Sequence, residues 1–267
     1  MYIAIIGCGY VGKAIGLHLK STGNQALTTT CDQNKAKMLE KDFDKVIVFD
    51  SRNDNPSFLS DCSTVIITVA PKIDESYEDA YFNTAKSICN NLTQDQRVIY
   101  TSSTSVYGDY EGQTVHEASP CIATHSNEKV LIKTEKEILS HKKSTILRLG
   151  EILGPGRNPV DRLKERKSCI LINDGRNATN LIHVQDIVYC IAWVLAKKIY
   201  GILNLVNDVH MTRREYYTKL SKENDLPLPE FILSDSVHHG QNKRVANEKL
   251  KGLGFTLSLP YYPFEPR

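Results

Sequence analysis

The sequence predicts an α/β fold built on a doubly wound parallel sheet. Two observations support this prediction. The first is a glycine-rich turn, Gly7-Cys8-Gly9-Tyr10-Val11-Gly12, which directly follows the short apolar segment 3–6. The second is the alternation of apolar, strand-like runs with helical patterns through the first 150 residues. Apolar runs separated by helices are typical of a parallel sheet that is covered on both faces.

The glycine-rich turn has the spacing of a Rossmann-type dinucleotide site. Gly7 allows a tight bend, Gly9 lets the backbone approach a pyrophosphate, and Gly12 lets the next helix pack on the strand. The N–H groups at the start of that helix, around Tyr10 and Val11, would face the phosphates together with the positive end of the helix dipole. We therefore expect an NAD(P) site here, with a glycine-rich turn that binds no ligand as the alternative.

The remaining elements follow in chain order. Short runs rich in β-branched and apolar residues predict strands at 26–30, 46–49, 64–69, 98–101, 145–149 and 202–206. Helical patterns lie at 11–20, 35–40, 77–92 and 187–195, and Thr212 with Glu215 has the spacing of a capping box for a later helix. In such sheets ligands bind outside the carboxyl ends of the strands, so the residues after each strand should converge on one cleft.

Composition excludes several functional classes. The 267-residue chain has 33 basic and 31 acidic residues, a net charge of +2, which gives no field for nucleic acid or an anionic membrane. Its seven cysteines are scattered without a CxxC spacing, so we expect reduced thiols and no metal site. Without a spanning apolar run or a secretory signal pattern, a cytoplasmic location is expected.

Four motifs in order resemble the extended short-chain dehydrogenase/reductase superfamily, in its NAD-dependent epimerase/dehydratase group. They are the glycine turn, the segment Ser102-Ser103-Thr104-Ser105-Val106-Tyr107-Gly108, the segment Leu147-Arg148-Leu149-Gly150 with the following GPGR, and Ile182-His183-Val184-Gln185-Asp186. The resemblance implies a Rossmann domain at 1–150 plus about 184–206. It also implies a smaller substrate-binding domain at 151–183 and 207–267. We expect His183 and Asp186 to be structural, with Asp186 capping the helix that follows.

The resemblance also implies a catalytic arrangement, from which this sequence departs. In the family a Ser or Thr hydrogen-bonds the substrate oxygen, and a Tyr with a Lys four residues later handles the proton. The hydroxyl position corresponds to Ser103, with Ser102 and Thr104 as neighbouring substrate-binding candidates. The Tyr and Lys positions hold Asn127 and Leu131. A shift of two residues gives His125 and Lys129, which keep the spacing on one helical face. Tyr107 and Tyr110 are other proton donors of the region.

The cofactor positions follow from the ends of the strands. The residue that grips the adenosine ribose corresponds to Thr30, with Asp32 two residues later, and Asp50 resembles the residue that contacts adenine. Ala70 and Pro71 would line the ribose on the nicotinamide side. A carboxylate at the ribose would repel a 2′-phosphate, so Thr30 favours NADP slightly over NAD.

Two functions remain open for the chain. One is an NAD(P)-dependent oxidoreductase or epimerase/dehydratase with an atypical active site, acting on a carbonyl or alcohol of a small molecule, with sugar-like compounds among the candidates. The other is a non-catalytic NAD(P)-binding sensor or scaffold. Nucleotide-sugar members carry an Arg where this chain has Thr179, although Arg157 and Arg244 are candidate substrate-binding residues. A homodimer is the expected assembly.

Overall fold

The structure is a computed structural model that describes residues 1–165, 170–172, 174–232 and 241–264. The chain divides into two compact units, which we describe one at a time. The first comprises Met1–Ser103, Ala123–Arg148 and Ile187–Leu203, and the second comprises Thr104–Ile122, Leu149–Asp186 and Asn204–Arg267.

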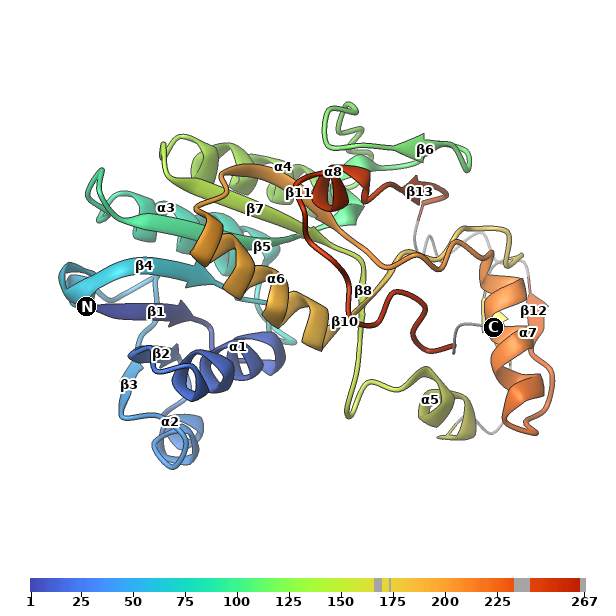
Figure 1. Cartoon of the computed structure of the whole chain (residues 1–267), viewed down its shortest axis with the longest axis horizontal. Coiled ribbons are helices and arrows are strands. Elements are labelled where there is room, and N and C mark those ends of the chain that lie inside the picture. Colours follow the sequence, from blue (N-terminus) through green and yellow to red (C-terminus); the bar gives the residue numbers. More distant parts are fainter. Residues whose placement is uncertain (166–169, 173, 233–240, 265–267) are drawn as a thin grey trace. The chain divides into compact units, whose positions relative to one another are not determined.

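A seven-stranded sheet forms the centre of the first unit (Figure 1). Its order is β11 (Gly201–Leu205), β7 (Ser144–Leu149), β5 (Arg97–Ser103), β4 (Cys62–Ile67), β1 (Tyr2–Ile6), β2 (Ala26–Thr30) and β3 (Lys45–Val48). Neighbouring strands from β3 across to β5 pair in parallel. The chain winds outward from β1 to β3 and then returns to the other side of β1 with β4. This reversal between β1 and β4 is the point where ligands bind in doubly wound sheets.

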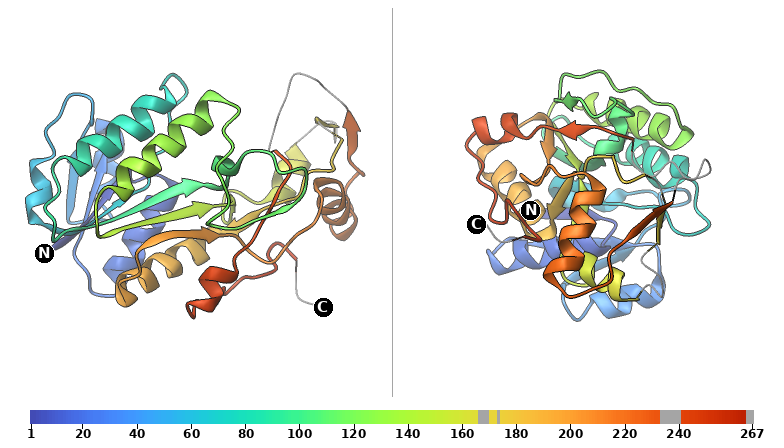
Figure 2. Two further views of the ribbon diagram at one scale, coloured as in Figure 1. Left: turned by 90° about the horizontal axis from the view of Figure 1, so that it is seen from above. Right: turned by 90° about the vertical axis from the view of Figure 1, so that its right-hand side faces the viewer.

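Helices cover both faces of this sheet. α1 (Tyr10–Ser21) and most of α6 (Val184–Lys197) lie on one face, and α3 (Thr84–Cys89) and α4 (Ser126–Leu139) lie on the other (Figure 2). α2 (Gln33–Leu39) packs beside β2 and β3, and the short helix η1 (Ser57–Asp61) precedes β4. The single helix expected at 77–92 is instead a π-helical turn, η2 (Glu78–Asn83), that continues into α3.

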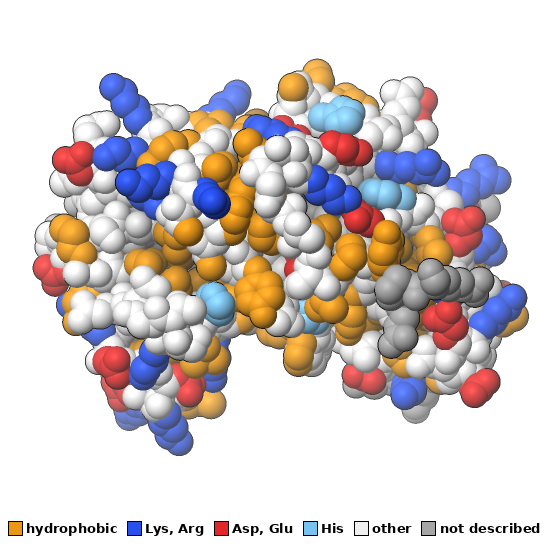
Figure 3. Space-filling view, in the orientation of Figure 1, with side chains coloured by type: hydrophobic (Ala, Val, Ile, Leu, Met, Phe, Trp, Pro, Cys, Tyr) orange, Lys and Arg blue, Asp and Glu red, His pale blue; other side chains and the backbone are white. Residues whose placement is uncertain are grey.

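The core of the first unit lies between the sheet and these helices. Strand residues such as Ala4, Leu27 and Val65 are fully buried, and Ile88 of α3 and Ile138 of α4 pack against the same cluster. On the opposite face the rings of His18 and Tyr189 meet edge to face at 5.6 Å and join α1 to α6. Hydrophobic side chains show through the polar surface along this face (Figure 3), where Tyr189 is 39% exposed.

The second unit consists of three short parallel strand pairs and four helices in its described part. The pairs are β6 (Thr114–Val115) with β13 (Arg244–Val245), β8 (Glu151–Leu153) with β10 (Leu181–His183), and β9 (Ile170–Ile172) with β12 (Glu230–Ile232). The helices are η3 (Thr104–Tyr107), α5 (Pro159–Glu165), α7 (Arg213–Glu223) and α8 (Glu248–Gly252). The expected capping box at the start of α7 is confirmed, since Thr212 and Glu215 bond reciprocally.

Segment 104–122 belongs to the second unit, whereas the sequence-based division assigned it to the Rossmann domain. The physical reason is its pairing with a distant segment. β6 pairs with β13, and the carbonyl oxygen of Asn242 accepts hydrogen bonds from the N–H groups of Tyr110 and Gly112. That the first unit binds the cofactor and the second the substrate stays a prediction.

Asp186 does not cap α6, contrary to expectation. It is fully buried, and its carboxylate accepts hydrogen bonds from the N–H groups of Ser258 and Leu259. His183 is structural, because its Nδ1 accepts from the N–H of Gln185 and its ring lies against that of Tyr262. The two residues therefore hold a loop and the C-terminal segment rather than a ligand.

The predicted fold class is confirmed by the parallel seven-stranded sheet with helices on both faces. In the described ranges no helix combines the length and the apolar character that crossing a membrane requires.

Candidate functional site

The glycine turn between β1 and α1 is held from both sides. The N–H of Gly7 donates to the hydroxyl of Thr29 at 3.1 Å, and the N–H of Cys8 donates to the Thr29 carbonyl oxygen at 2.7 Å. From the β4 side, the hydroxyl of Thr68 donates to the carbonyl oxygen of Gly7 at 2.8 Å. Threonines at the ends of β2 and β4 thus fix the turn that the sequence predicts.

A Cβ would have different surroundings at each of the three glycines of the turn. Gly7 has a φ of +85°, and a Cβ there would lie 3.0 Å from the Val69 backbone. A Cβ on Gly12 would approach the carbonyl oxygen of Gly7 to 2.6 Å. Gly9 is the exception, because a Cβ there would meet only that same oxygen, at 4.0 Å. The backbone at Gly9 therefore borders open space, as a close approach by a ligand requires.

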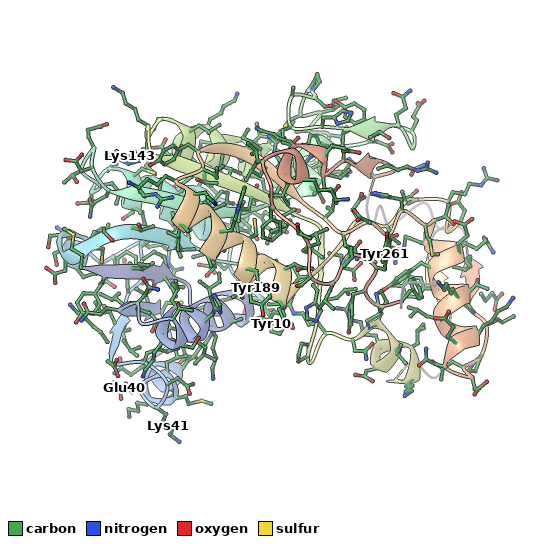
Figure 4. The ribbon with its side chains drawn as sticks, in the orientation of Figure 1. Tyr10, Glu40, Lys41, Lys143, Tyr189 and Tyr261 are labelled. Carbon is green, nitrogen blue, oxygen red and sulfur yellow. The ribbon has the colours of Figure 1, made fainter. Side chains whose placement is uncertain are left out.

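The start of α1 suits an anion. Its N-cap is Gly9, which carries no side chain to occupy the first N–H groups, and the first turn from Tyr10 to Lys13 contains no acidic residue. A helix leaves these N–H groups without intrahelical acceptors, and its dipole makes this end positive. Tyr10 and Val11 are half-buried here, and Figure 4 shows Tyr10 at this end of α1. Burial raises the pKa of the Cys8 thiol to about 11, so this thiol stays neutral within the turn.

The residues at the end of β2 differ in exposure. Thr30 is only 6% exposed, and its hydroxyl accepts a hydrogen bond from the N–H of Asp32, so its contact with a ribose stays a prediction. Cys31 and Asp32, which follow the strand, are both exposed. Asp32 caps α2, because its Oδ1 accepts from the N–H groups of Asn34 and Lys35 at 2.8 and 3.0 Å. Those two hydrogen bonds are the main reason why the pKa of Asp32 is lowered.

Asp50 follows β3 and is tied to a neighbouring arginine. The guanidinium of Arg52 donates from Nε to the Asp50 carboxylate at 2.9 Å, and its other arm reaches the second carboxylate oxygen. This side-chain hydrogen bonding is the largest cause of the lowered pKa of Asp50. The carboxylate is therefore ionised and already neutralised by Arg52, and contact with adenine stays a prediction.

The loop after β4 carries the expected residues Ala70, which is exposed, and Pro71, which is half-buried. The next residue is the exposed Lys72, whose pKa is raised chiefly by its interaction with the thiol of Cys31. Neither Lys72 nor Cys31 belongs to a sequence motif of the site. β2 is buried along its whole length, so the first exposed position at this end lies after the strand.

At the end of β5 the three neighbouring hydroxyl residues have different surroundings. Ser102 is 6% exposed, and its hydroxyl donates to Oε1 of Glu135 at 2.7 Å, so its hydrogen is already engaged within the protein. Ser103, the last residue of β5, is half-buried. Thr104 is buried and opens the short helix η3 of the second unit. The strand alternation thus sends Ser102 inward and leaves Ser103 as the more accessible hydroxyl.

A buried ion pair next to Ser102 anchors α4 to β7. Arg148 of β7 donates from Nε and from a terminal nitrogen to the carboxylate of Glu135, at 3.0 and 2.7 Å, and both side chains are 4% exposed. The hydroxyl of Ser102 completes the cluster. Such a pair holds its elements in place because loss of either partner leaves a buried charge uncompensated.

The start of α4 provides no tyrosine–lysine dyad. Asn127 is exposed, whereas Leu131 is 3% exposed and belongs to the packed side of the helix. His125 is the N-cap residue of α4, and its N–H donates to Oε2 of Glu128 at 3.1 Å. His125 and Lys129 are both exposed and one turn apart. Their catalytic role stays a prediction.

The other candidates lie in the second unit. Arg157 and Arg244 are both exposed, the latter in β13, so their substrate-binding role is untested. Tyr107 is buried with its hydroxyl on Oδ1 of Asn204, and the hydroxyl of Tyr110 donates to the Pro120 carbonyl oxygen. Both tyrosines therefore have structural partners. Within the described ranges, no cluster of His, Cys, Asp or Glu is arranged to hold a metal ion.

A family model matches most of the chain and shows the family to which it belongs. Residues 3–205 match the model of the NAD dependent epimerase/dehydratase family. The chain belongs to this family. The match includes the glycine turn, the end of β5 and α4, so the resemblance predicted from the motifs is confirmed.

Individual relatives agree over nearly the full length. Protein YeeZ of Escherichia coli K12 is 29% identical over 276 aligned residues, which cover 97% of this chain and 96% of YeeZ. The dTDP-glucose 4,6-dehydratase of Bacillus anthracis in complex with NAD has a TM-score of 0.82 at 15% identity, covering 97% and 92% of the two chains. The UDP-glucuronic acid 4-epimerase of Bacillus cereus in complex with NAD has a TM-score of 0.78 at 18% identity, covering 99% and 94%. These two structures share the fold with this chain.

Proposed function

We propose that this chain binds NAD or NADP at the glycine turn and acts as an oxidoreductase or epimerase on a carbonyl or alcohol of a small, sugar-like molecule. The observation that carries the proposal is the geometry of the turn. The space beside Gly9 is open, the turn is fixed by Thr29 and Thr68, and the start of α1 presents N–H groups without a competing carboxylate. These features fit the pyrophosphate of a dinucleotide.

Membership of the NAD-dependent family supports the choice of cofactor. The sugar-nucleotide enzymes that share the fold support a sugar-like substrate. Bound nicotinamide supplies or accepts the hydride. The chain's own contribution is to position the substrate. In this proposal the hydroxyl of Ser103 hydrogen-bonds the substrate oxygen, and His125 or a water molecule takes or gives the proton that a tyrosine handles in other members.

A second candidate function is a non-catalytic NAD(P)-binding sensor or scaffold. The observation that favours it is the pair of residues at the dyad positions. Asn127 has no titratable group, and Leu131 is buried in the packed face of α4, where a lysine would have to lose its hydration. The same dinucleotide site serves both functions, and they differ in whether the bound cofactor is turned over.

A titration of NADH and NADPH fluorescence with the chain and its Gly9→Val variant tests the shared part of both functions. Because a Cβ at Gly9 would meet only one oxygen, at 4.0 Å, the variant should fold normally while its methyl groups fill the space that the pyrophosphate needs. We expect at least a hundredfold loss of affinity for both cofactors. Gly252→Val is the matched control, because Gly252 of α8 also has open space around its Cβ position.

Unchanged binding by the Gly9→Val variant would overturn the assignment of the site. With binding established, a screen of carbonyl and alcohol substrates separates the two functions. Oxidation of bound NAD(P)H by a carbonyl compound, or reduction of bound NAD(P)+ by an alcohol, supports the enzyme. Binding without turnover across the screen supports the sensor.

A further inference from the structure

The loop after β3, residues 50–54, lies beside the end of β2. The N–H of Phe49, the first residue after β3, donates to the carbonyl oxygen of Thr30, the last residue of β2, at 2.9 Å. In Rossmann-type sites the residue at the end of the second strand contacts the adenosine ribose. The adenine is attached to that ribose, so in the proposed dinucleotide site the base would lie next to this loop.

Hydrogen bonds hold the loop in one conformation. The N–H groups of Asn53 and Asp54 donate to the carbonyl oxygen of Asp50 at 3.0 and 2.9 Å, and the Asp54 carboxylate accepts from the Asp50 N–H at 2.6 Å. The hydroxyls of Ser51 and Thr84 are hydrogen-bonded at 2.7 Å, which ties the loop to the start of α3. The side chains of the loop therefore stand on a rigid support.

Arg52 of this loop has a planar guanidinium group that Asp50 holds by its edge. Nε of Arg52 donates to the two oxygens of the Asp50 carboxylate at 2.9 and 3.2 Å, and a terminal nitrogen donates to Oδ2. The N–H bonds of a guanidinium lie in its plane, so these hydrogen bonds leave its two faces available for stacking. The Arg52 side chain is 45% exposed in spite of this pairing.

A planar base suits this guanidinium group better than a phosphate does. The carboxylate of Asp50 offsets the charge of Arg52, so the attraction of the pair for a phosphate is reduced. The flat faces remain, and an arginine plane stacks on aromatic rings and on nucleic-acid bases. The pair therefore offers adenine a planar surface at a fixed position.

We propose that Arg52 stacks on the adenine of the bound dinucleotide and that Asp50 is a positioning residue that holds the guanidinium plane. This inference rests on the proposed dinucleotide site and adds to it the recognition of the base. It gives Asp50 an indirect role, in place of the direct contact with adenine that the resemblance implies. The contact acts equally on NAD and NADP, because both contain the same adenine.

The probe for this contact is ADP-ribose, which contains the adenosine and the pyrophosphate but no nicotinamide. Calorimetry should show that Arg52→Ala binds it at least tenfold more weakly than the unmodified chain, equivalent to about 1.4 kcal/mol. Arg52→Lys should lose most of the same affinity, because a lysine keeps the charge but has no planar group. Arg162→Ala is the matched control, since Arg162 is also 45% exposed and pairs with a carboxylate, that of Glu151 in the second unit.

Two further measurements separate stacking from an ionic contact. The ratio of the affinities of the unmodified chain and Arg52→Ala should stay constant between about 50 and about 500 mM NaCl, because salt screens an ionic contact with a phosphate. Asp50→Asn should weaken ADP-ribose binding in the unmodified chain and have no further effect in Arg52→Ala, because its effect depends on the guanidinium that Asp50 holds.

Full affinity of Arg52→Lys, or a ratio that falls with salt, would overturn the inference, since the charge of Arg52 would then act on the phosphates. Unchanged binding by Arg52→Ala would overturn it as well. An equal loss from Asp50→Asn with and without Arg52 would show that Asp50 contacts the ligand directly and is not a positioning residue. Absence of ADP-ribose binding to the unmodified chain would instead refute the proposed function itself.

Discussion

The proposed NAD(P) site, here called the nucleotide end, and the proposed substrate site, here called the catalytic end, differ in how much of the family's chemistry they contain. At the nucleotide end, around the glycine turn, the backbone geometry is complete and fixed by Thr29 and Thr68. At the catalytic end, formed by Ser103 and the start of α4, the anchoring ion pair is present but the tyrosine–lysine dyad is replaced by Asn127 and Leu131. Binding a dinucleotide depends mainly on backbone shape, whereas proton transfer depends on one side chain. A fold can therefore bind a dinucleotide even where the side chain that transfers the proton is missing.

The largest effect on the catalytic end should come from Glu135→Ala. Removing this carboxylate leaves the buried guanidinium of Arg148 uncompensated and the hydroxyl of Ser102 without its acceptor. We expect a loss of about 3–5 kcal/mol in the free energy of unfolding, measured by urea denaturation. Glu137→Ala, on the same helix, is the matched control. A loss below 1 kcal/mol for Glu135→Ala would show that the ion pair does not anchor α4.

The effect of Ser103→Ala should be confined to the catalytic end. Any turnover found in the substrate screen should fall at least tenfold, since the substrate oxygen loses its hydrogen bond, while the affinity for NADPH stays within about twofold. Ser105→Ala is a control from the same segment. Full turnover by Ser103→Ala would remove this hydroxyl from the mechanism.

A smaller effect is expected from Cys31→Asp at the nucleotide end. The sequence alone suggests Thr30 for this test, but Thr30 is buried with its hydroxyl on the N–H of Asp32. A carboxylate at Cys31 would repel a 2′-phosphate, so the ratio of NADPH to NADH affinity should fall about five- to tenfold. The neutral variant Cys31→Ser should leave this ratio unchanged. A ratio that is the same for both variants would place the ribose away from the end of β2.

The sheet and the glycine turn could be predicted from the sequence because each depends on local patterns. The apolar runs become β1, β2, β4 and β5, and the glycine spacing becomes a turn in which Gly7 has positive φ. The sequence pattern of the helix predicted at 77–92 gives no sign of the π-helical turn that precedes α3, a turn that in the structure packs against α4.

Side-chain direction at the ends of strands could not be predicted, because it depends on contacts between distant segments. Ser102 and Ser103 are adjacent hydroxyls that point to opposite faces of β5, and in the structure Ser102 lies on the face where Glu135 of α4 accepts its hydrogen bond. The assignment of 104–122 to the first unit missed the pairing of β6 with β13 for the same reason.

The most direct measurement is a map of backbone amide shifts on adding ADP-ribose to the ¹⁵N-labelled chain. If the pyrophosphate lies at the start of α1, the amide resonances of Gly9, Tyr10 and Gly12 should show the largest, saturable shifts, and that of Gly252 in α8 should stay unchanged. Saturable shifts centred on residues elsewhere, with the amides of the glycine turn unaffected, would contradict the site on which the proposed functions depend.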